Sequence, residues 1–88
     1  MTSTYRVLVT NRFERDFRKL SRNTQRRIAE ILTLVARNPF AFEVLSGGFR
    51  GLRKIRVGDY RLIYRIDSED DEKVVRLLFV AHRRSVYK

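Results

Sequence analysis

The chain contains no cysteine and a single histidine, and these two absences remove several kinds of chemistry. Without cysteine there is no disulfide framework, no thiolate nucleophile and no cysteine-bound zinc site. A single histidine cannot assemble a histidine metal cluster. Any reaction must therefore rest on arginine, lysine, tyrosine, His82 or a carboxylate, and we expect neither a metal nor another cofactor.

Long hydrophobic runs are also missing. The longest apolar run covers residues 77–81, whereas a membrane-spanning helix needs about 20 apolar residues. The chain does not open with a charged region followed by an apolar region, which is the pattern of a signal peptide. We therefore expect a cytoplasmic protein without a membrane partner.

Acidic residues are scarce and unevenly placed. Twenty lysines and arginines face ten acids, so the formal net charge is +10, and five of the acids fall within residues 67–72. So basic a surface attracts polyanions through its potential and through counterion release, which makes nucleic acid the first partner to consider. The length of 88 residues and the hydrophobic content of 43% fit one compact domain, residues 1–88, with a small core.

A strand and two helices are predicted in the first half of the chain. Residues 5–10 alternate, which indicates a strand with Tyr5, Val7 and Val9 on one side. Asn11 is expected to cap the first helix, since Glu14 follows in capping-box position. The apolar stripe of this helix consists of Phe13, Phe17 and Leu20.

The second helix is expected to begin at a cap on Ser21 or Asn23 and to end at Asn38, because the following Pro39 disfavours helical geometry there. Its apolar face holds Ile28, Ile31, Leu32 and Val35. Residues 40–51 show no clean period and are expected to be irregular. The phenylalanines in this stretch either close the core or form a partner surface; we expect core positions for Phe40, Phe42 and Phe49.

Three strands are predicted in the second half, over residues 52–57, 60–67 and 73–81. Gly58-Asp59 lies between the first two and is a two-residue hairpin signal, because glycine readily adopts the positive φ that such turns need. The acidic residues 67–72 include the tip of the next hairpin. The pattern as a whole predicts the α+β class.

This register divides the first hairpin into two faces. Arg56 is predicted opposite Arg61, and side chains alternate along each strand. One face then carries four cations and no acid, namely Lys54, Arg56, Arg61 and Arg65. The other is apolar and belongs to the core, with Ile55, Val57, Tyr60, Leu62, Tyr64 and Ile66.

Like charges placed opposite each other destabilise a sheet unless an anion relieves them. Phosphate is the anion expected here, because guanidinium groups bind it in bidentate fashion. A solvated face is the simpler alternative, although such a face normally mixes charges of both signs.

The cationic face suits RNA cleavage by the 2′-hydroxyl as well as passive backbone binding. Such cleavage needs a proton acceptor, charge stabilisation and a proton for the leaving 5′-oxygen. Crowding by Arg56 and Arg61 should lower the pKa of Lys54 toward proton-transfer use, while the arginines stay charged. The residues by themselves leave both functions open.

Two segments resemble the RelE/ParE superfamily of toxins, and within it the RelE branch. They are KIRVGDYRLIYRI at residues 54–66 and AHRRSVYK at residues 81–88. The resemblance implies a RelE-like fold of order β-α-α-β-β-β, with two N-terminal helices on a small, mainly antiparallel, twisted sheet. It also implies a metal-independent endoribonuclease that cuts mRNA in the ribosomal A site, inhibits translation and is restrained by a RelB-like antitoxin.

The resemblance assigns catalytic positions residue by residue. It implies proton transfer or charge at Lys54, an electrostatic role at Arg61, and charge alone at Arg56, where the bacterial enzyme has a lysine that can release a proton. In the tail it implies phosphate binding at Arg83 and a base-stacking or 2′-hydroxyl-orienting role at Tyr87. His82 beside them is a candidate acid or base.

Further cations are expected to bind phosphate without reading sequence. On the cationic face and in the tail these are Arg65 and Arg84, the latter also a rival of Arg83; on the second helix they are Arg22, Arg26 and Arg27. Two other functions remain open, a ParE-like inhibitor of DNA gyrase and an inactive nucleic-acid-binding relative. The antitoxin is expected to place a helix in an apolar groove and an acidic segment over the basic face.

Overall fold

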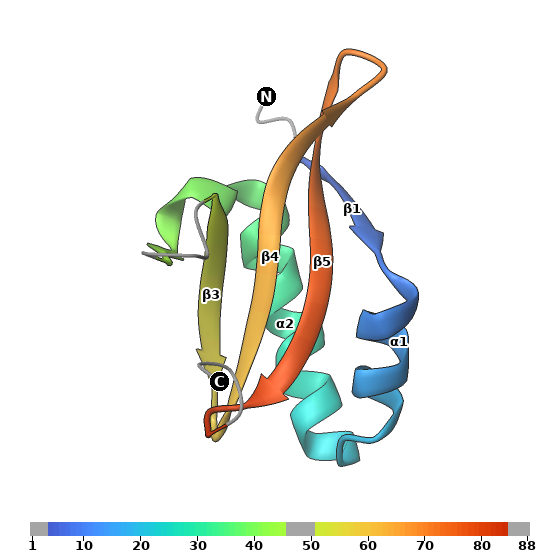
Figure 1. The fold of residues 1–88 in the computed structure, drawn as a ribbon, viewed down its shortest axis with the longest axis vertical. Helices are drawn as coiled ribbons and strands as arrows, with labels where there is room; N and C mark the ends of the chain where they lie inside the picture. The colour runs from blue at the N-terminus through green and yellow to red at the C-terminus, as the bar shows by residue number, and fades with distance from the viewer. Residues whose placement is uncertain (1–3, 46–50, 85–88) are drawn as a thin grey trace.

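The computed structural model describes residues 4–45 and 51–84, in which two helices pack on one face of a mixed sheet (Figure 1). The elements in chain order are β1 (Arg6–Val9), α1 (Asn11–Arg18), α2 (Arg22–Arg37), the 3-10 helix η1 (Pro39–Ala41), β2 (Glu43–Val44), β3 (Leu52–Val57), β4 (Tyr60–Glu69) and β5 (Glu72–His82). The predicted α+β class is confirmed.

Within this part of the chain the sheet has five strands in the order β1-β5-β4-β3-β2. β1 is parallel to β5, and the other neighbours are antiparallel. α2 lies behind β4 and β5, while α1 flanks β5 beyond the end of β1 (Figure 1). No helix of the described residues covers the opposite face of β3, β4 and β5, and we call it the open face.

The helix starts follow capping chemistry, with one correction to the sequence prediction. Thr10 rather than Asn11 caps α1, because its hydroxyl accepts a hydrogen bond from the Phe13 backbone N–H and also donates to the Leu78 carbonyl on β5. Asn11 already lies inside the helix. Ser21 caps α2 as predicted, accepting from the Thr24 backbone N–H.

The core lies between the helices and the sheet, and the predicted apolar face of the hairpin belongs to it. Its fully buried members include Ile28, Val35, Leu62, Tyr64, Val75 and Leu77. Burial of such a side chain contributes roughly 1.5 to 3 kcal/mol. The Tyr64 hydroxyl donates to the Pro39 carbonyl over 2.6 Å, which ties β4 to η1.

The predicted hairpin register is confirmed, with Arg56 opposite Arg61 and Val57 opposite Tyr60. Gly58 has a φ of +62°, as the turn requires. At the far end of β4, Asp70 and Asp71 also have positive φ and form the tip that joins β4 to β5. The two turns therefore lie at opposite ends of β4.

The stretch predicted to be irregular contains η1 and the two-residue strand β2, which pairs with β3. Phe42 packs against the core as predicted, but Phe40 is 51% exposed and that prediction is wrong. The Phe40 ring instead lies beneath the Arg53 guanidinium and against the edge of the Tyr5 ring. Phe49 lies outside the described residues.

Candidate functional site

Three of the predicted cations lie together on the open face near the Gly58-Asp59 turn. Lys54 and Arg56 stand on β3, and Arg61 stands opposite Arg56 on β4. Arg61 is half-buried, whereas Arg56 is exposed and donates from Nε to the Gly58 carbonyl over 3.4 Å. Arg61 stands on β4, the central strand of the five.

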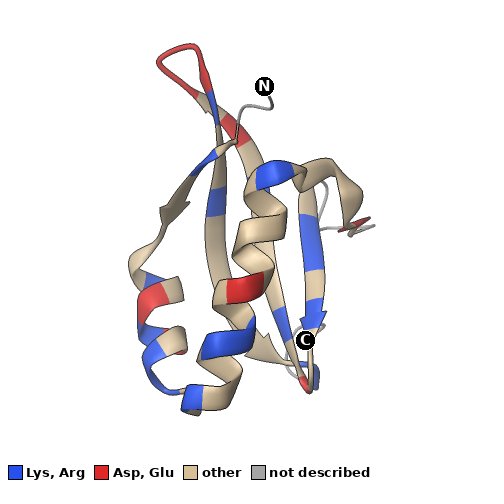
Figure 2. Cartoon of the chain, turned by 180° about the vertical axis from the view of Figure 1, so that it is seen from behind, with Lys and Arg blue, Asp and Glu red and all other residues tan. Residues whose placement is uncertain are grey.

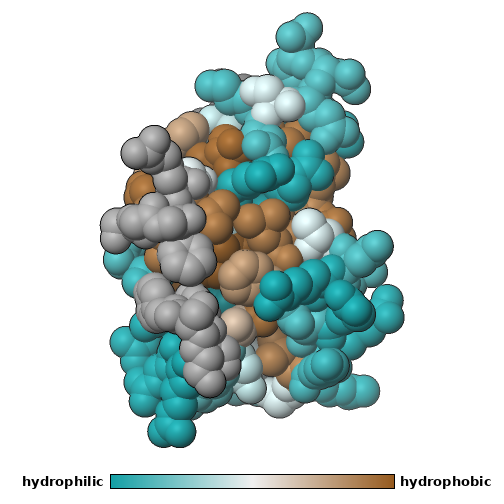
Figure 3. Space-filling view, in the orientation of Figure 1, coloured by the Kyte–Doolittle hydropathy of each residue, from teal (hydrophilic) through white to brown (hydrophobic). Residues whose placement is uncertain are grey.

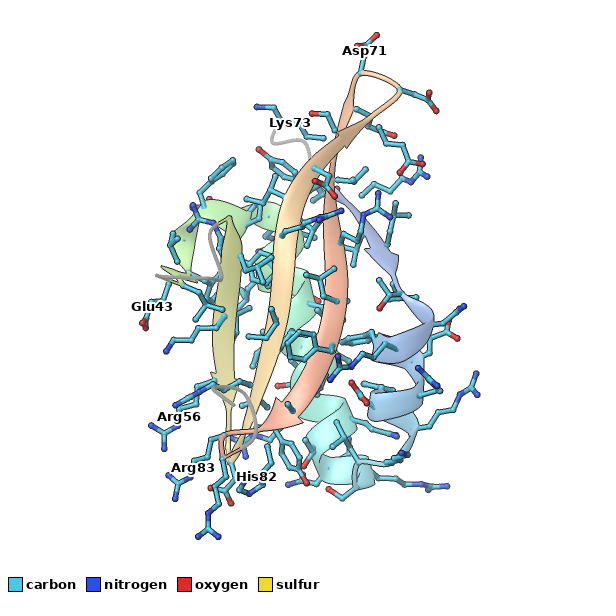
Figure 4. The ribbon with its side chains drawn as sticks, viewed as in Figure 1. Glu43, Arg56, Asp71, Lys73, His82 and Arg83 are labelled. Carbon is cyan, nitrogen blue, oxygen red and sulfur yellow. The ribbon has the colours of Figure 1, made fainter. Side chains whose placement is uncertain are left out.

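The chain after β5 returns to the same turn. The Arg83 backbone N–H donates to the Asp59 carbonyl over 2.8 Å, so this residue lies beside the hairpin. Arg56 and Arg83 project from the same end of the molecule in Figure 4. We call Lys54, Arg56, Arg61 and Arg83 the basic cluster; Tyr87 lies outside the described residues.

His82 is placed differently from the basic cluster. It pairs in register with Tyr60, a residue that packs against the helix-side core, and the two rings meet edge to face at 5.5 Å. Its Nδ1 accepts from the Arg84 backbone N–H, so a proton on the neutral ring belongs on Nε2. Ala81, not His82, is the neighbour of Arg61 across the sheet.

The prediction that the open face carries no acid is wrong. Glu43 on β2 pairs with Lys54 at 3.4 Å, and Asp67 on β4 accepts from Arg65 over 2.7 Å and from Arg76 over 3.0 Å. The signal for Asp67 was present in the sequence, because it follows Arg65 by two residues in a strand. The Glu43 contact had no such signal, since β2 is too short to show a period.

Arg65 consequently belongs to a structural ion-pair network rather than to the basic cluster. Burial opposes ionisation of Asp67, but hydrogen bonds from Arg76 and Arg65 outweigh it and hold the pKa of the Asp67 carboxyl below its usual value. Arg76 is also paired with Glu69 at 2.9 Å. The phosphate-binding role of Arg65 stays a prediction, in which phosphate would compete with the Asp67 carboxylate for the guanidinium.

We expect the Asp67→Asn variant to lose about 1 kcal/mol of unfolding free energy at pH 7, because two arginines lose their shared carboxylate. The folded pKa of Asp67 is lowered, so its stabilisation is present above the unfolded value of about 3.9 and disappears as the pH falls through the folded value. Urea unfolding should show a smaller difference from wild type at pH 3. Asp71→Asn, at the exposed tip, is the control. If wild type and Asp67→Asn differ in unfolding free energy as much at pH 3 as at pH 7, the stabilising role of the Asp67 carboxylate is contradicted.

An apolar cluster forms the floor of the open face. Ile63 is fully buried there and Leu45 nearly so, packed against Leu52, Leu78, Phe79 and Ala81. Figure 3 shows hydrophobic residues gathered in the middle of this view, bordered by hydrophilic residues. The Arg12 guanidinium stacks on Phe79 at 4.4 Å. Because Lys54 and Arg61 border this floor, their charges interact with a ligand in a medium less polar than water.

The comparisons with known proteins agree with the fold and with the resemblance in the sequence. The family described as the ParE toxin of the type II toxin-antitoxin system parDE matches residues 7–87, nearly the whole chain. The chain belongs to the RelE/ParE toxin superfamily.

Three solved toxin-antitoxin complexes contain chains similar to this RelE/ParE toxin. RelBE2 from Mycobacterium tuberculosis is 32% identical, with a TM-score of 0.80 over 94% of this chain and 95% of that one. The RelE-RelB complex of Pyrococcus horikoshii is 25% identical, with a TM-score of 0.71 over 94% and 99%. The RelBE complex of E. coli is 24% identical, with a TM-score of 0.73 over 89% and 95%, and its likeness shows the fold alone. No curated protein matches.

In this RelE/ParE toxin, acids gather at the β4-β5 tip, while lysines and arginines are spread over the helices and strands (Figure 2). Arg22 and Arg26 are exposed at the start of α2, and a methyl group on Gly58 would lie 3.6 Å from Arg27 Nη1, so the Arg27 side chain lies beside the hairpin turn. The acids of the β4-β5 tip lie at the other end. Of the predicted helix arginines, Arg27 thus lies at the hairpin end of the molecule.

A cavity of about 340 Å³ lies beside Thr4, Tyr5 and residues 71–73. In residues 4–45 and 51–84, no group of three potential metal ligands comes together, and no helix is long and apolar enough to cross a membrane.

Proposed function

We propose that this toxin is a ribosome-dependent endoribonuclease that cuts mRNA in the A site and so inhibits translation. The main support is the hydrogen bond from the Arg83 backbone N–H to the Asp59 carbonyl. Through this bond Arg83, the first cation after β5, lies beside the hairpin that carries the other cations. Cations from three separate chain segments, on β3, on β4 and after β5, then lie toward the hairpin end of the sheet.

The proposed reaction uses the RNA's own 2′-hydroxyl. Its oxygen attacks the adjacent phosphorus and loses its proton to a base, the new P–O2′ bond replaces the P–O5′ bond, and the leaving 5′-oxygen receives a proton. Arg61 and Arg56 stabilise the negative charge on the phosphorane, since guanidinium groups remain charged throughout. Arg83 holds the neighbouring phosphate, and by resemblance Tyr87 orients the nucleotide.

The remaining predicted residues receive supporting roles. Arg84 and the α2 residues Arg22, Arg26 and Arg27 attract ribosomal RNA as a sequence-independent basic surface. We assign His82 a packing role against Tyr60, because its ring lies with the helix-side residues and its Nδ1 is already used. No step of the proposed reaction calls for a metal ion.

A RelB-like antitoxin is the proposed restraining partner, since the similar chains of M. tuberculosis and P. horikoshii were solved as toxin-antitoxin complexes. An acidic antitoxin segment would neutralise the basic cluster, and the net charge of +10 favours fast association with it.

Inhibition of DNA gyrase is the second candidate, because the matching family is described as the ParE toxin. Such an activity acts through protein contact and does not need the basic cluster. Substitutions in this cluster therefore separate the two functions.

The deciding experiment is mRNA cleavage on stalled ribosomes in a reconstituted translation reaction, with ribosome-free mRNA as control. We expect cuts in the A-site codon that require the ribosome and weaken in the Lys54→Ala and Tyr87→Phe variants. A parallel supercoiling assay with gyrase should show no inhibition. Intact mRNA together with gyrase inhibition by the folded protein would overturn the proposal.

A further inference from the structure

The edge strand β2 places a carboxylate directly beside the basic cluster. Glu43 is the register partner of Lys54, and its Oε2 lies 3.4 Å from the Lys54 Nζ. The Lys54 side chain is only 19% exposed, whereas that of Glu43 is 70% exposed. The more exposed carboxylate thus contacts a lysine whose side chain is largely covered.

Three arginines of the described strands β3 and β4 also share the open face with Lys54. Arg56 follows it by two residues on β3, and Arg61 and Arg65 flank its register partner Ile63 on β4. These cations favour the neutral amine of Lys54, while the Glu43 carboxylate favours the ammonium. The apolar floor strengthens both effects, because it excludes water from one side.

We propose that Glu43 is a positioning residue, which holds Lys54 as an ammonium on the open face and releases it to an RNA phosphate. This inference rests on the proposed function for the identity of the incoming anion. It reverses the expectation from the sequence, in which crowding by arginines prepared Lys54 to accept a proton. With Glu43 beside it, Lys54 instead supplies positive charge or a proton.

The geometry suits an exchangeable contact. The distance of 3.4 Å is long for a charge-assisted hydrogen bond, and Glu43 stands on an edge strand of two residues. An ion pair with one exposed partner is weak, so a phosphate that also contacts Arg56 and Arg61 can displace the carboxylate. Glu43 would then keep the site charged without blocking it.

The direct test is the NMR titration of the Lys54 side chain. This measurement does not require the protein to cleave RNA, and its signals are simple to assign because the chain has only four lysines. In Glu43→Gln the titration midpoint of Lys54 should move to lower pH by roughly 0.2 to 0.7 of a pH unit, the shift that corresponds to the coupling of a partly exposed ion pair. Glu43→Asp should retain the higher midpoint.

Glu14→Gln is the matched control, since Glu14 forms an exposed ion pair of 3.5 Å with Arg18 on α1 and its loss raises the net charge equally. This control should leave the Lys54 midpoint unchanged. Identical midpoints in wild type and Glu43→Gln would overturn the inference.

The functional readout is the pH dependence of cleavage. Loss of the Lys54 proton should lower the rate at high pH, and this alkaline decline should begin at lower pH in Glu43→Gln than in wild type or Glu14→Gln. Superimposable profiles of active wild type and Glu43→Gln would contradict the positioning role. If wild type cleaves no mRNA, the proposed function fails, while the NMR titration still decides whether Glu43 holds the ammonium.

Discussion

Replacing Arg61 with alanine is expected to reduce A-site cleavage about 100-fold or more, the usual cost of removing one preorganised group that stabilises transition-state charge. Arg61 stands on β4, the middle strand of the sheet, opposite Arg56 on β3 and beside Ala81 on β5. It is half-buried, so its charge acts on a bound phosphate with less screening than an exposed arginine would.

Arg61→Lys separates charge from geometry. Lysine retains the positive charge but presents a point charge in place of a planar pair of donors, so we expect an intermediate rate. Single-turnover cleavage of ribosome-bound mRNA measures the chemical effect, and RNA affinity measured separately accounts for any loss of binding.

Arg6→Ala is the matched control for Arg61→Ala. Arg6 on β1 pairs with Glu72 at 3.1 Å, near the acidic end of the molecule, so its loss lowers the net charge equally and leaves the basic cluster intact. We expect near-normal cleavage from this variant. If Arg61→Ala cleaves as well as Arg6→Ala does, the catalytic assignment of the basic cluster is wrong.

The second large effect is on stability. Tyr64→Phe is expected to lose about 1 to 3 kcal/mol of unfolding free energy, because the buried Pro39 carbonyl loses the hydroxyl that donates to it over 2.6 Å. Tyr64→Ala should lose about 3 to 5 kcal/mol, since a fully buried ring is removed as well. Denaturant unfolding at pH 7 measures both.

Burial also makes this tyrosine sensitive to alkali. Burial raises the pKa of Tyr64 to about 12, although the positive charge of Arg53 lowers it. The unfolded chain releases this proton near pH 10, so the stabilisation is complete below pH 10 and is lost between pH 10 and 12. A shift of this size corresponds to about 2 to 3 kcal/mol.

Wild type and Tyr64→Phe should therefore converge in stability as the pH rises from 10 to 12. Tyr60→Phe removes a hydroxyl from a half-buried tyrosine in the same strand and is the control. A constant difference between wild type and Tyr64→Phe across this range would show that the Tyr64 proton is not linked to folding. The Tyr64 contact also holds η1 in place, just before the strand that carries Glu43.

Local patterns predicted most of the secondary structure. The hairpin from Leu52 to Ile66 followed from an alternation of period two and a glycine that permits positive φ, both of which act between near neighbours in the chain. The cap at Ser21 and the end of α2 before Pro39 are local for the same reason. The predicted cap of α1, Asn11, was one residue away from the observed cap, Thr10. The two residues are adjacent, and both the threonine hydroxyl and the asparagine amide can cap a helix.

The sequence by itself determined the α+β class, the hairpin register and the grouping of Lys54, Arg56 and Arg61, because strand alternation fixes which side chains share a face. Only the tertiary structure decided that Glu43 meets Lys54, that Arg83 returns to the Asp59 turn, and that the His82 ring lies with the helix-side residues. Each of these depends on a contact between chain segments that no local period specifies. A two-residue strand and a single backbone hydrogen bond acquire their positions only when the sheet assembles around them.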